Sequence, residues 1–263
     1  MVSPSPKPEV VTRVNGDPNY NARTTRRAVG LLMSDSGIGG RVSLEQDVQT
    51  PIGGGFGASA ASATSAVYAA AGALGLEKTK ASLALYAHEA EIIEQTGLGT
   101  VSVIFDAAGA GAIVAPGEPG KAKFMTVDVP HGTQIITAFL APFEKKDALS
   151  SRAVSRRINE LGHASLGAFL SDPTLENLAC EGERFSAALG LESVEVKKLI
   201  GIAKEAGATH ASQNMIGYAM HSIVPQGSSV RVAKALESYS RDVRVDTFEI
   251  GTRRAGTGPA SRR

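Results

Sequence analysis

A glycine-dense loop that leads into an alanine-rich segment constrains this chain more than any other feature. Residues 53–57 are Gly-Gly-Gly-Phe-Gly, and the segment from Ala58 to Leu74 consists of small or apolar residues. Before the loop, Val42 to Val48 alternates enough to be a strand. The sequence therefore predicts a strand, a glycine loop and a buried helix, in that order.

The composition indicates a folded globular protein and excludes several classes of function. Hydrophobic residues make up 43% of the 263 residues and charged residues 20%, with no apolar run near the roughly 18 residues that a membrane span needs. A net charge of +1 provides no general field for nucleic acid or an anionic membrane. Cys180 is the one cysteine, which excludes an internal disulfide and a cysteine-rich zinc site. We expect a soluble, cytoplasmic protein with no nucleic-acid or membrane partner.

Strand and helix patterns are mixed along the whole chain, which predicts an α/β or α+β fold. Expected helices cover 22–32, 58–74, 78–95, 151–170, 175–189, 195–206 and 230–240; expected strands cover 9–14, 42–48, 112–115, 133–140, 221–224 and 243–250, and 101–105 is a strand or a short helix. Pro116 to Gly120 is the best linker candidate. We therefore predict a domain over residues 1–125 that carries the glycine loop and a second domain over 126–263.

The chemistry of the loop is that of a phosphate site. Glycines let the backbone approach a polyphosphate closely, and the first turn of the following helix presents unpaired N–H groups and a partial positive charge. The expected nucleotide-binding residues are Gly53, Gly54, Gly55, Phe56, Gly57, Ala58 and Ser59. The Ser59 hydroxyl is suited to ligate magnesium. The alternative is a flexible loop before a packed helix; the loop matches neither the Walker pattern nor the dinucleotide fingerprint.

With these residues in view, Pro51 to Ala61 resembles the second motif of the GHMP kinases, the family of galactokinase, homoserine kinase and mevalonate kinase. Segments His88 to Glu91, Thr96 to Gly99, Arg156 to Asn159 and Pro173 to Asn177 look like the archaeal pantoate kinases. The resemblance implies a two-domain fold, with an amino-terminal domain like ribosomal protein S5 and a carboxy-terminal ferredoxin-like domain.

A carboxylate interrupts the apolar face of the helix expected at 78–95. Glu91 shares that face with Leu83, Ala84 and Ala87, and a buried carboxylate needs a cation, a donor or a polar cleft. In the GHMP family a glutamate on the corresponding helix holds magnesium together with the loop serine, which the resemblance assigns to Glu91 and Ser59. Glu89 is the competing choice, about 200° around the helix.

Other residues carry weaker expectations. His88 is one turn before Glu91, so it either binds the acceptor substrate or has a structural role. Ser212 and Gly217 lie where the family places its third motif, a loop near the phosphates. The remaining histidines show no metal-ligand spacing with one another or with Cys180, and we expect them to be structural or surface residues: His131, His163, His210 and His221.

The chain departs from the family at three places. Thr100 follows Gly-Leu-Gly where many pantoate kinases have an aspartate, and threonine is no base at neutral pH. Ala112 to Ala115 is apolar where those kinases carry an arginine. The opening strand and Ser/Gly-rich loop are absent before the segment matched by Val10 to Leu32, so we expect a shortened or divergent form.

The resulting hypothesis is an ATP- and Mg²⁺-dependent kinase that phosphorylates pantoate to 4-phosphopantoate for coenzyme A synthesis. Its expected catalytic residues are Ser59, Glu91 and Thr100, its metal ligands are Ser59 and Glu91, and its acceptor-side residue is His88. The alternatives are a GHMP kinase for another small alcohol and an inactive homologue that serves as a binding or assembly protein. A homodimer is compatible with the sequence.

Overall fold

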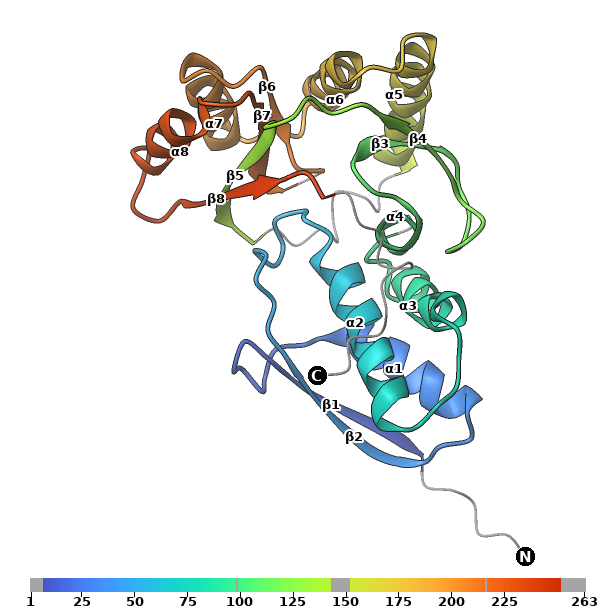
Figure 1. Cartoon of the computed structure of the whole chain (residues 1–263). Helices are drawn as coiled ribbons and strands as arrows, with labels where there is room; N and C mark the ends of the chain where they lie inside the picture. Colours follow the sequence, from blue (N-terminus) through green and yellow to red (C-terminus); the bar gives the residue numbers. More distant parts are fainter. Residues whose placement is uncertain (1–6, 98, 143–151, 216, 252–263) are drawn as a thin grey trace, which may run out of the picture.

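The computed structural model describes residues 7–97, 99–142, 152–215 and 217–251, and within these ranges it contains eight helices and eight strands (Figure 1). The first half begins with a parallel strand pair, β1 (Pro8–Val14) and β2 (Gly40–Gln46), connected by α1 (Arg23–Asp35). A parallel pair cannot be joined by a tight turn, so the helix provides the crossover. Three further helices follow: α2 (Ala58–Ala73), α3 (Lys80–Glu94) and α4 (Thr100–Asp106).

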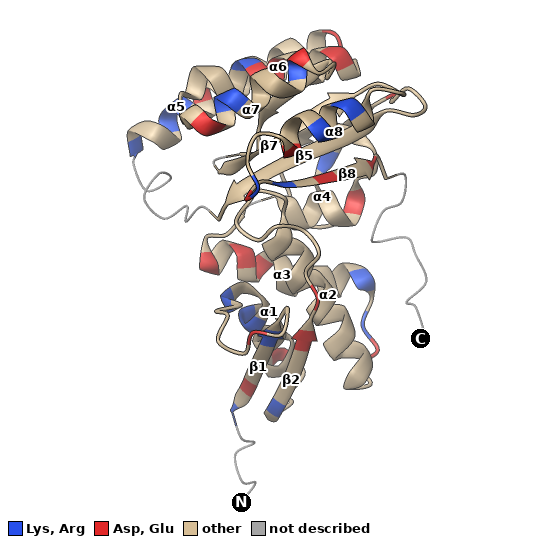
Figure 2. Ribbon diagram, turned by 90° about the vertical axis from the view of Figure 1, so that its left-hand side faces the viewer, with Lys and Arg blue, Asp and Glu red and all other residues tan. Residues whose placement is uncertain are grey.

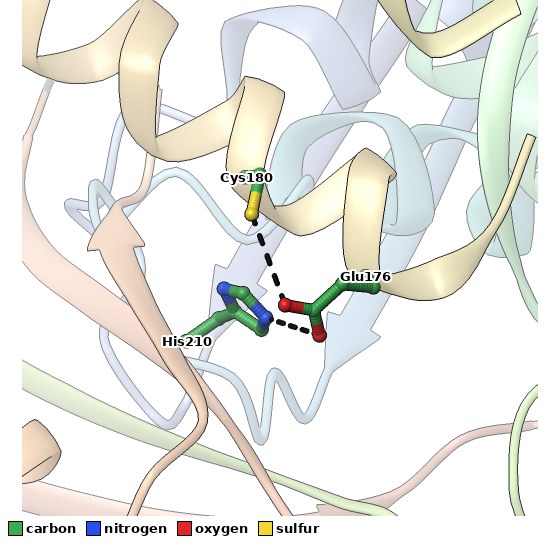
Figure 3. Close-up of side chains that lie close together, drawn as sticks. All are labelled: Glu176, Cys180 and His210. Carbon is green, nitrogen blue, oxygen red and sulfur yellow. Dashed lines mark hydrogen bonds and ion pairs between the residues drawn. The ribbon is translucent and has the colours of Figure 1, made fainter. Parts of the chain in front are cut away.

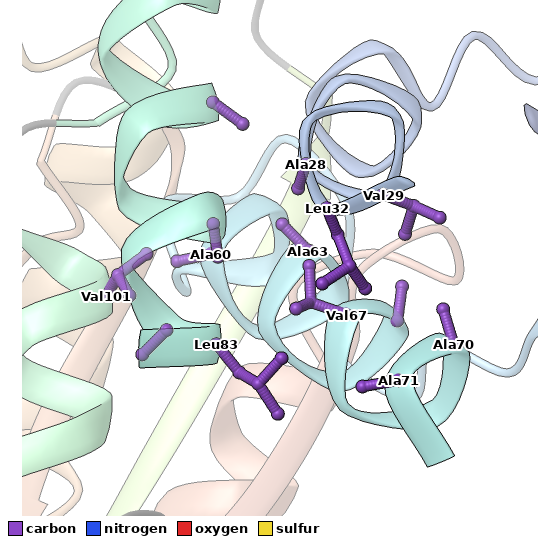
Figure 4. Packing of buried hydrophobic residues seen from close by; sticks show 14 of the residues in the cluster. Ala28, Val29, Leu32, Ala60, Ala63, Val67, Ala70, Ala71, Leu83 and Val101 are labelled. Carbon is purple, nitrogen blue, oxygen red and sulfur yellow. The ribbon is translucent and has the colours of Figure 1, made fainter. Parts of the chain in front are cut away.

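Helices α1, α2 and α3 pack against one another through small side chains. Ala28, Ala60, Ala63 and Ala87 are fully buried at this interface, together with a few larger residues such as Leu32 (Figure 4). An alanine side chain ends at Cβ, so helices packed through alanines approach closely without leaving voids. The buried alanine-rich helix predicted from the sequence is confirmed.

The next unit is a hairpin that is attached to α4. Strands β3 (Ala110–Ala115) and β4 (Lys123–Val127) pair antiparallel, so the linker prediction for Pro116–Gly120 was wrong: its prolines and glycines form the hairpin connection. Ser102 Oγ donates to the Gly117 carbonyl at 2.8 Å, and the Gly120 N–H donates to Asp106 Oδ2 at 2.7 Å. The predicted division between residues 125 and 126 falls inside β4 and stays a prediction.

The second half is an antiparallel sheet with the strand order β6-β7-β5-β8. Its elements are β5 (Gln134–Ala141), α5 (Arg152–Ser171), α6 (Leu175–Leu189), α7 (Val194–Glu205), β6 (His210–Gln213), β7 (Tyr218–Val224), α8 (Ser229–Glu237) and β8 (Arg244–Glu249). This strand order, with helical crossovers after β5 and β7, is the ferredoxin-like arrangement. A second core lies between the sheet and α7 and α8, and it contains Ile136, Met220, Leu199 and Leu236. The predicted mixed α/β fold is confirmed.

Charges of both signs are interspersed on the outer helices. Figure 2 shows patches of both signs on α5, α6 and α7, which agrees with the near-zero net charge. Among the described helices, none has the length and apolar character that crossing a membrane requires.

Substitution of a buried alanine in α2 tests the close packing. We expect Ala63→Leu to lower the free energy of unfolding by about 1–3 kcal/mol, because the added carbons have no space between α1 and α2. Ala69→Leu, at an exposed position of the same helix, should change it by about 0.5 kcal/mol or less. Urea unfolding followed by circular dichroism measures both, and equal effects would contradict the packing argument.

Candidate phosphate and metal site

The glycine loop lies between β2 and α2 and has an unusual backbone. Gly53, Gly55 and Gly57 have φ angles of +81°, +79° and +75°, a region that residues with a Cβ rarely adopt. Gly57 is also the residue that caps the amino end of α2, so the first N–H groups of that helix open onto the loop. When residues with a left-handed backbone conformation alternate with residues of negative φ, the backbone forms a concave surface of the kind that binds anions. The phosphate role predicted from the sequence is therefore compatible with this geometry.

The two predicted metal ligands lie next to each other. Ser59, in the first turn of α2, donates a hydrogen bond from Oγ to Glu91 Oε1 at 2.9 Å. Glu91 is on α3 and is 1% exposed, whereas Glu89 is exposed on the same helix. A Cβ added at Gly97 would lie 2.9 Å from both carboxylate oxygens, so any larger residue there would require the Glu91 carboxylate to move. The packing of α2 against α3 thus brings a hydroxyl and a buried carboxylate together beside the glycine loop.

A segment from the second half of the chain closes the other side of the loop. Asn214, just after β6, donates from Nδ2 to the Gly54 carbonyl at 3.3 Å, and a Cβ at Gly55 would lie 2.8 Å from the Asn214 carbonyl oxygen. His221 Nδ1 is 2.7 Å from Asn214 Oδ1. Because that oxygen only accepts, His221 must donate, and its Nδ1 carries the proton. A hydrogen-bonded relay from His221 through Asn214 thus holds the loop.

Sequence analysis placed the third motif at this segment but missed Asn214. Gly217, which it named, does face the loop, since a Cβ there would lie 3.6 Å from the Gly53 carbonyl oxygen. Ser212 does not reach the loop, and its hydroxyl bonds instead to the Gln213 carbonyl. An asparagine in a loop has no periodic signal, so only the tertiary contact identifies it.

The remaining predicted site residues surround the loop at different distances. Thr100 begins α4 and touches the loop, since a Cβ at Gly57 would lie 2.9 Å from Thr100 Cγ2. Ala58 is the first residue of α2, and the Phe56 ring lies against Gly54. His88 is half-buried on α3. Lys121 is the main cause of the lowered pKa of Glu118, on the β3–β4 turn, and the nearby His88 makes a smaller contribution to it. His88 thus lies on the side of α3 that faces the hairpin.

The structure brings together three side chains that the sequence does not connect. His210 and Cys180, which lack metal-ligand spacing in the sequence, lie together with Glu176 between α6 and β6. Sequence spacing could not show this, because docking of a helix on a strand brings the residues together.

Comparisons with known proteins agree with this architecture. Residues 23–110 match the family described as GHMP kinases N terminal domain. A solved structure described as a phosphotransferase related to the CoA biosynthesis pathway superposes with a TM-score of 0.79 at 25% identity, over 94% of this chain and 80% of that chain. This chain has the GHMP-kinase fold.

More distant GHMP kinases share the fold as well. Homoserine kinase from Cytophaga hutchinsonii superposes with a TM-score of 0.66 at 16% identity, covering 97% of this chain and 85% of that one. Mevalonate kinase from Methanococcus jannaschii gives 0.64 at 13% identity, covering 93% and 86%. No curated protein sequence gives a significant match. The resemblance to GHMP kinases is confirmed for the fold, while the narrower one to pantoate kinases stays a prediction.

Glycine 55 tests the loop. Gly55→Ala should weaken Mg²⁺-ATP binding about tenfold or more, because the new methyl group would push Asn214 away from the loop. Gly75→Ala is the matched control, since Gly75 also has a positive φ, of +66°, but has open space around its Cβ position. Titration calorimetry on both folded variants measures the affinities, and wild-type affinity in Gly55→Ala would remove the loop from the site.

The relay also predicts a pH dependence of stability. Desolvation of the half-buried imidazole lowers the pKa of His221 below the ordinary 6.5, and the negative charge of Glu183 opposes this only in part. As the pH falls through 6.5, the unfolded chain therefore takes up a proton that the folded chain does not, and the free energy of unfolding decreases. His221→Gln should reduce this decrease between pH 7 and 5, whereas His163→Gln, at an exposed site, should not. Urea titrations across that range give the comparison.

Proposed function

We propose that this chain is an ATP-dependent kinase that transfers the γ-phosphoryl group to a hydroxyl of a small molecule, with pantoate as the acceptor. The observation that carries the proposal is the 2.9 Å contact between Ser59 and Glu91 at the mouth of the glycine loop. The likeness to the phosphotransferase related to CoA biosynthesis supports the choice of pantoate, whose phosphorylation gives 4-phosphopantoate.

The two side chains fit a magnesium ion. A serine hydroxyl and a carboxylate are hard oxygen donors, and the glycine at position 97 places no side chain against the carboxylate. When bound, the ion would neutralise charge on the β- and γ-phosphates. Ser59 and Glu91 would hold it.

The chain itself contributes positioning and electrostatic stabilisation. The N–H groups of Gly53–Gly57 and the amino end of α2 would bind the phosphates, and the Asn214 relay would keep the loop in its conformation. In a loose transition state, the bond from the γ-phosphorus to the bridging oxygen of ADP would be largely broken before the acceptor oxygen bonds to phosphorus. The hydroxyl would therefore keep its proton until late and release it to a phosphoryl oxygen or to water as ADP leaves. Thr100 would then position the acceptor without acting as a base, and His88 would contact the acceptor from α3.

A second candidate is a nucleotide-binding protein without turnover. Thr100 favours it, because an aspartate base is absent at the start of α4, and the apolar strand β3 offers no arginine for an acceptor carboxylate. A GHMP kinase for a different small alcohol is the remaining alternative. These three functions differ in whether ATP is consumed and in which acceptor stimulates its consumption.

The deciding experiment measures ADP release by the purified chain with Mg²⁺-ATP and each of pantoate, homoserine, mevalonate and galactose. Stimulation by pantoate, with 4-phosphopantoate identified by mass spectrometry, supports the proposal. Stimulation by another alcohol would mean that this alcohol, rather than pantoate, is the acceptor. If ATP binds and every acceptor leaves it intact, the chain is a binding protein.

The two glutamates of α3 provide the matched variants. Glu91→Gln should lower kcat about 100-fold or more, equivalent to about 2.7 kcal/mol, because the amide preserves the shape and can still accept from Ser59 but cannot neutralise a cation. Glu89→Gln should leave kcat close to that of the wild type, since Glu89 is exposed. The reverse ranking would show that Glu89 is the metal-side carboxylate.

A further inference from the structure

A second group of ligand-type side chains lies in the other half of the molecule, between α6 and β6. Glu176, Cys180 and Glu183 follow one another at helical spacing on α6, so they share one face of that helix. His210, the first residue of β6, faces them from the sheet. Figure 3 shows the Cys180 thiol and the His210 ring both pointing toward the Glu176 carboxylate.

The distances within this group are close to those of a metal site. His210 Nε2 is 2.9 Å from Glu176 Oε2, Cys180 Sγ is 4.0 Å from Glu176 Oε1, and ligand atoms of all three residues lie within 4.8 Å of one another. In a tetrahedral zinc site with bonds of about 2.0–2.3 Å, neighbouring ligand atoms lie roughly 3.3–3.6 Å apart. The 2.9 Å and 4.0 Å distances fall on either side of this range, and both involve Glu176, whose side chain is 75% exposed and can move.

A second carboxylate lies beside the other ring nitrogen of His210, as is common for histidines that bind metals. His210 is 8% exposed, and its Nδ1 lies 3.5 Å from Glu183 Oε1, with no good hydrogen bond to any group in the described part of the chain. Glu183 is fixed by the Ala211 N–H at 2.7 Å and by Lys204 Nζ at 2.8 Å. A carboxylate behind one ring nitrogen, with the other nitrogen facing the ligands, is the usual second layer of a zinc site.

The position of Glu183 suits that supporting role, because its Oε1 lies beside the Nδ1 side of the His210 ring. A small shift of the ring would bring Nδ1–H within hydrogen-bond distance of this carboxylate. Nε2 would then be the nitrogen that faces Glu176 and Cys180 with its lone pair.

A simpler role leaves part of the arrangement unexplained. An ion pair between His210 and Glu176 accounts for the 2.9 Å contact but not for the thiol directed at the same carboxylate.

We propose that Glu176, Cys180 and His210 bind a divalent cation of the zinc type, with a fourth position open to water or another ligand. One sulfur, one nitrogen and one oxygen donor suit Zn²⁺ and Co²⁺, whereas Mg²⁺ prefers oxygen alone. The ion would fasten α6 to β6, the strand that leads directly into Asn214. The site does not depend on the proposed kinase activity.

Binding of Co²⁺ and Zn²⁺ to the full chain, without nucleotide, tests the proposal. The wild type should bind one Co²⁺ with the intense thiolate-to-cobalt charge-transfer absorption, and Zn²⁺ should displace it. Cys180→Ala should abolish this absorption, and His210→Gln and Glu176→Gln should weaken Zn²⁺ binding measured by competition with a chelating dye. Glu183→Gln should weaken it by about 10- to 100-fold. His163→Gln, an exposed histidine on α5, is the control that should match the wild type.

Three results would overturn the proposal. One is the absence of the charge-transfer absorption in the wild type. Another is Zn²⁺ affinity in Cys180→Ala equal to that of the wild type, which would mean adventitious binding elsewhere. The third is unchanged affinity in Glu176→Gln, a variant that keeps the fold because its side chain is exposed. The comparison of Glu176→Gln with the wild type tests the metal-site proposal even if His210→Gln fails to fold.

Discussion

The close contact of α2 with its neighbours is the constraint on which the rest of the candidate site depends. Fully buried alanines such as Ala60, Ala63 and Ala87 let α2 and α3 approach until Ser59 and Glu91 are within hydrogen-bond distance. Larger side chains at these positions would separate the helices and, with them, the hydroxyl from the carboxylate. The small residues that make the helix packing possible therefore also set the geometry of the site.

Burial of the Glu91 carboxylate costs free energy, and the neighbouring Ser59 hydroxyl offsets part of that cost. A carboxylate that is 1% exposed is destabilising unless it has a donor or a cation, and Ser59 supplies the donor in the protein alone. The same two oxygens, facing the amino end of α2, are what a hard cation requires. In the proposed kinase, a bound ion would take over from the Ser59 hydroxyl as the partner of the Glu91 carboxylate.

Sequence analysis predicted the parts of this molecule that have local signals. Glu91 could be identified because it interrupts an apolar helical face, and the loop because its glycines precede an alanine-rich helix. Strand β6 was missed, since its four residues, three of them buried polar residues (His210, Ser212 and Gln213), acquire their structure from pairing with β7. Asn214 and the grouping of His210 with Glu176 and Cys180 were missed for a related reason: both depend on how elements dock, and the histidine lies on a different element from the other two.

The hydrogen bond from Asn214 to Gly54 joins positions that are 160 residues apart. Contacts of such long range form late in folding, because the intervening chain must first be closed into a loop. On the ribosome, the glycine loop and the Ser59–Glu91 pair emerge well before the strand that completes their surroundings. A nascent chain that contains only the first core therefore has a glycine loop with one side missing, and the candidate phosphate site is complete only after Asn214 has been synthesised and docked.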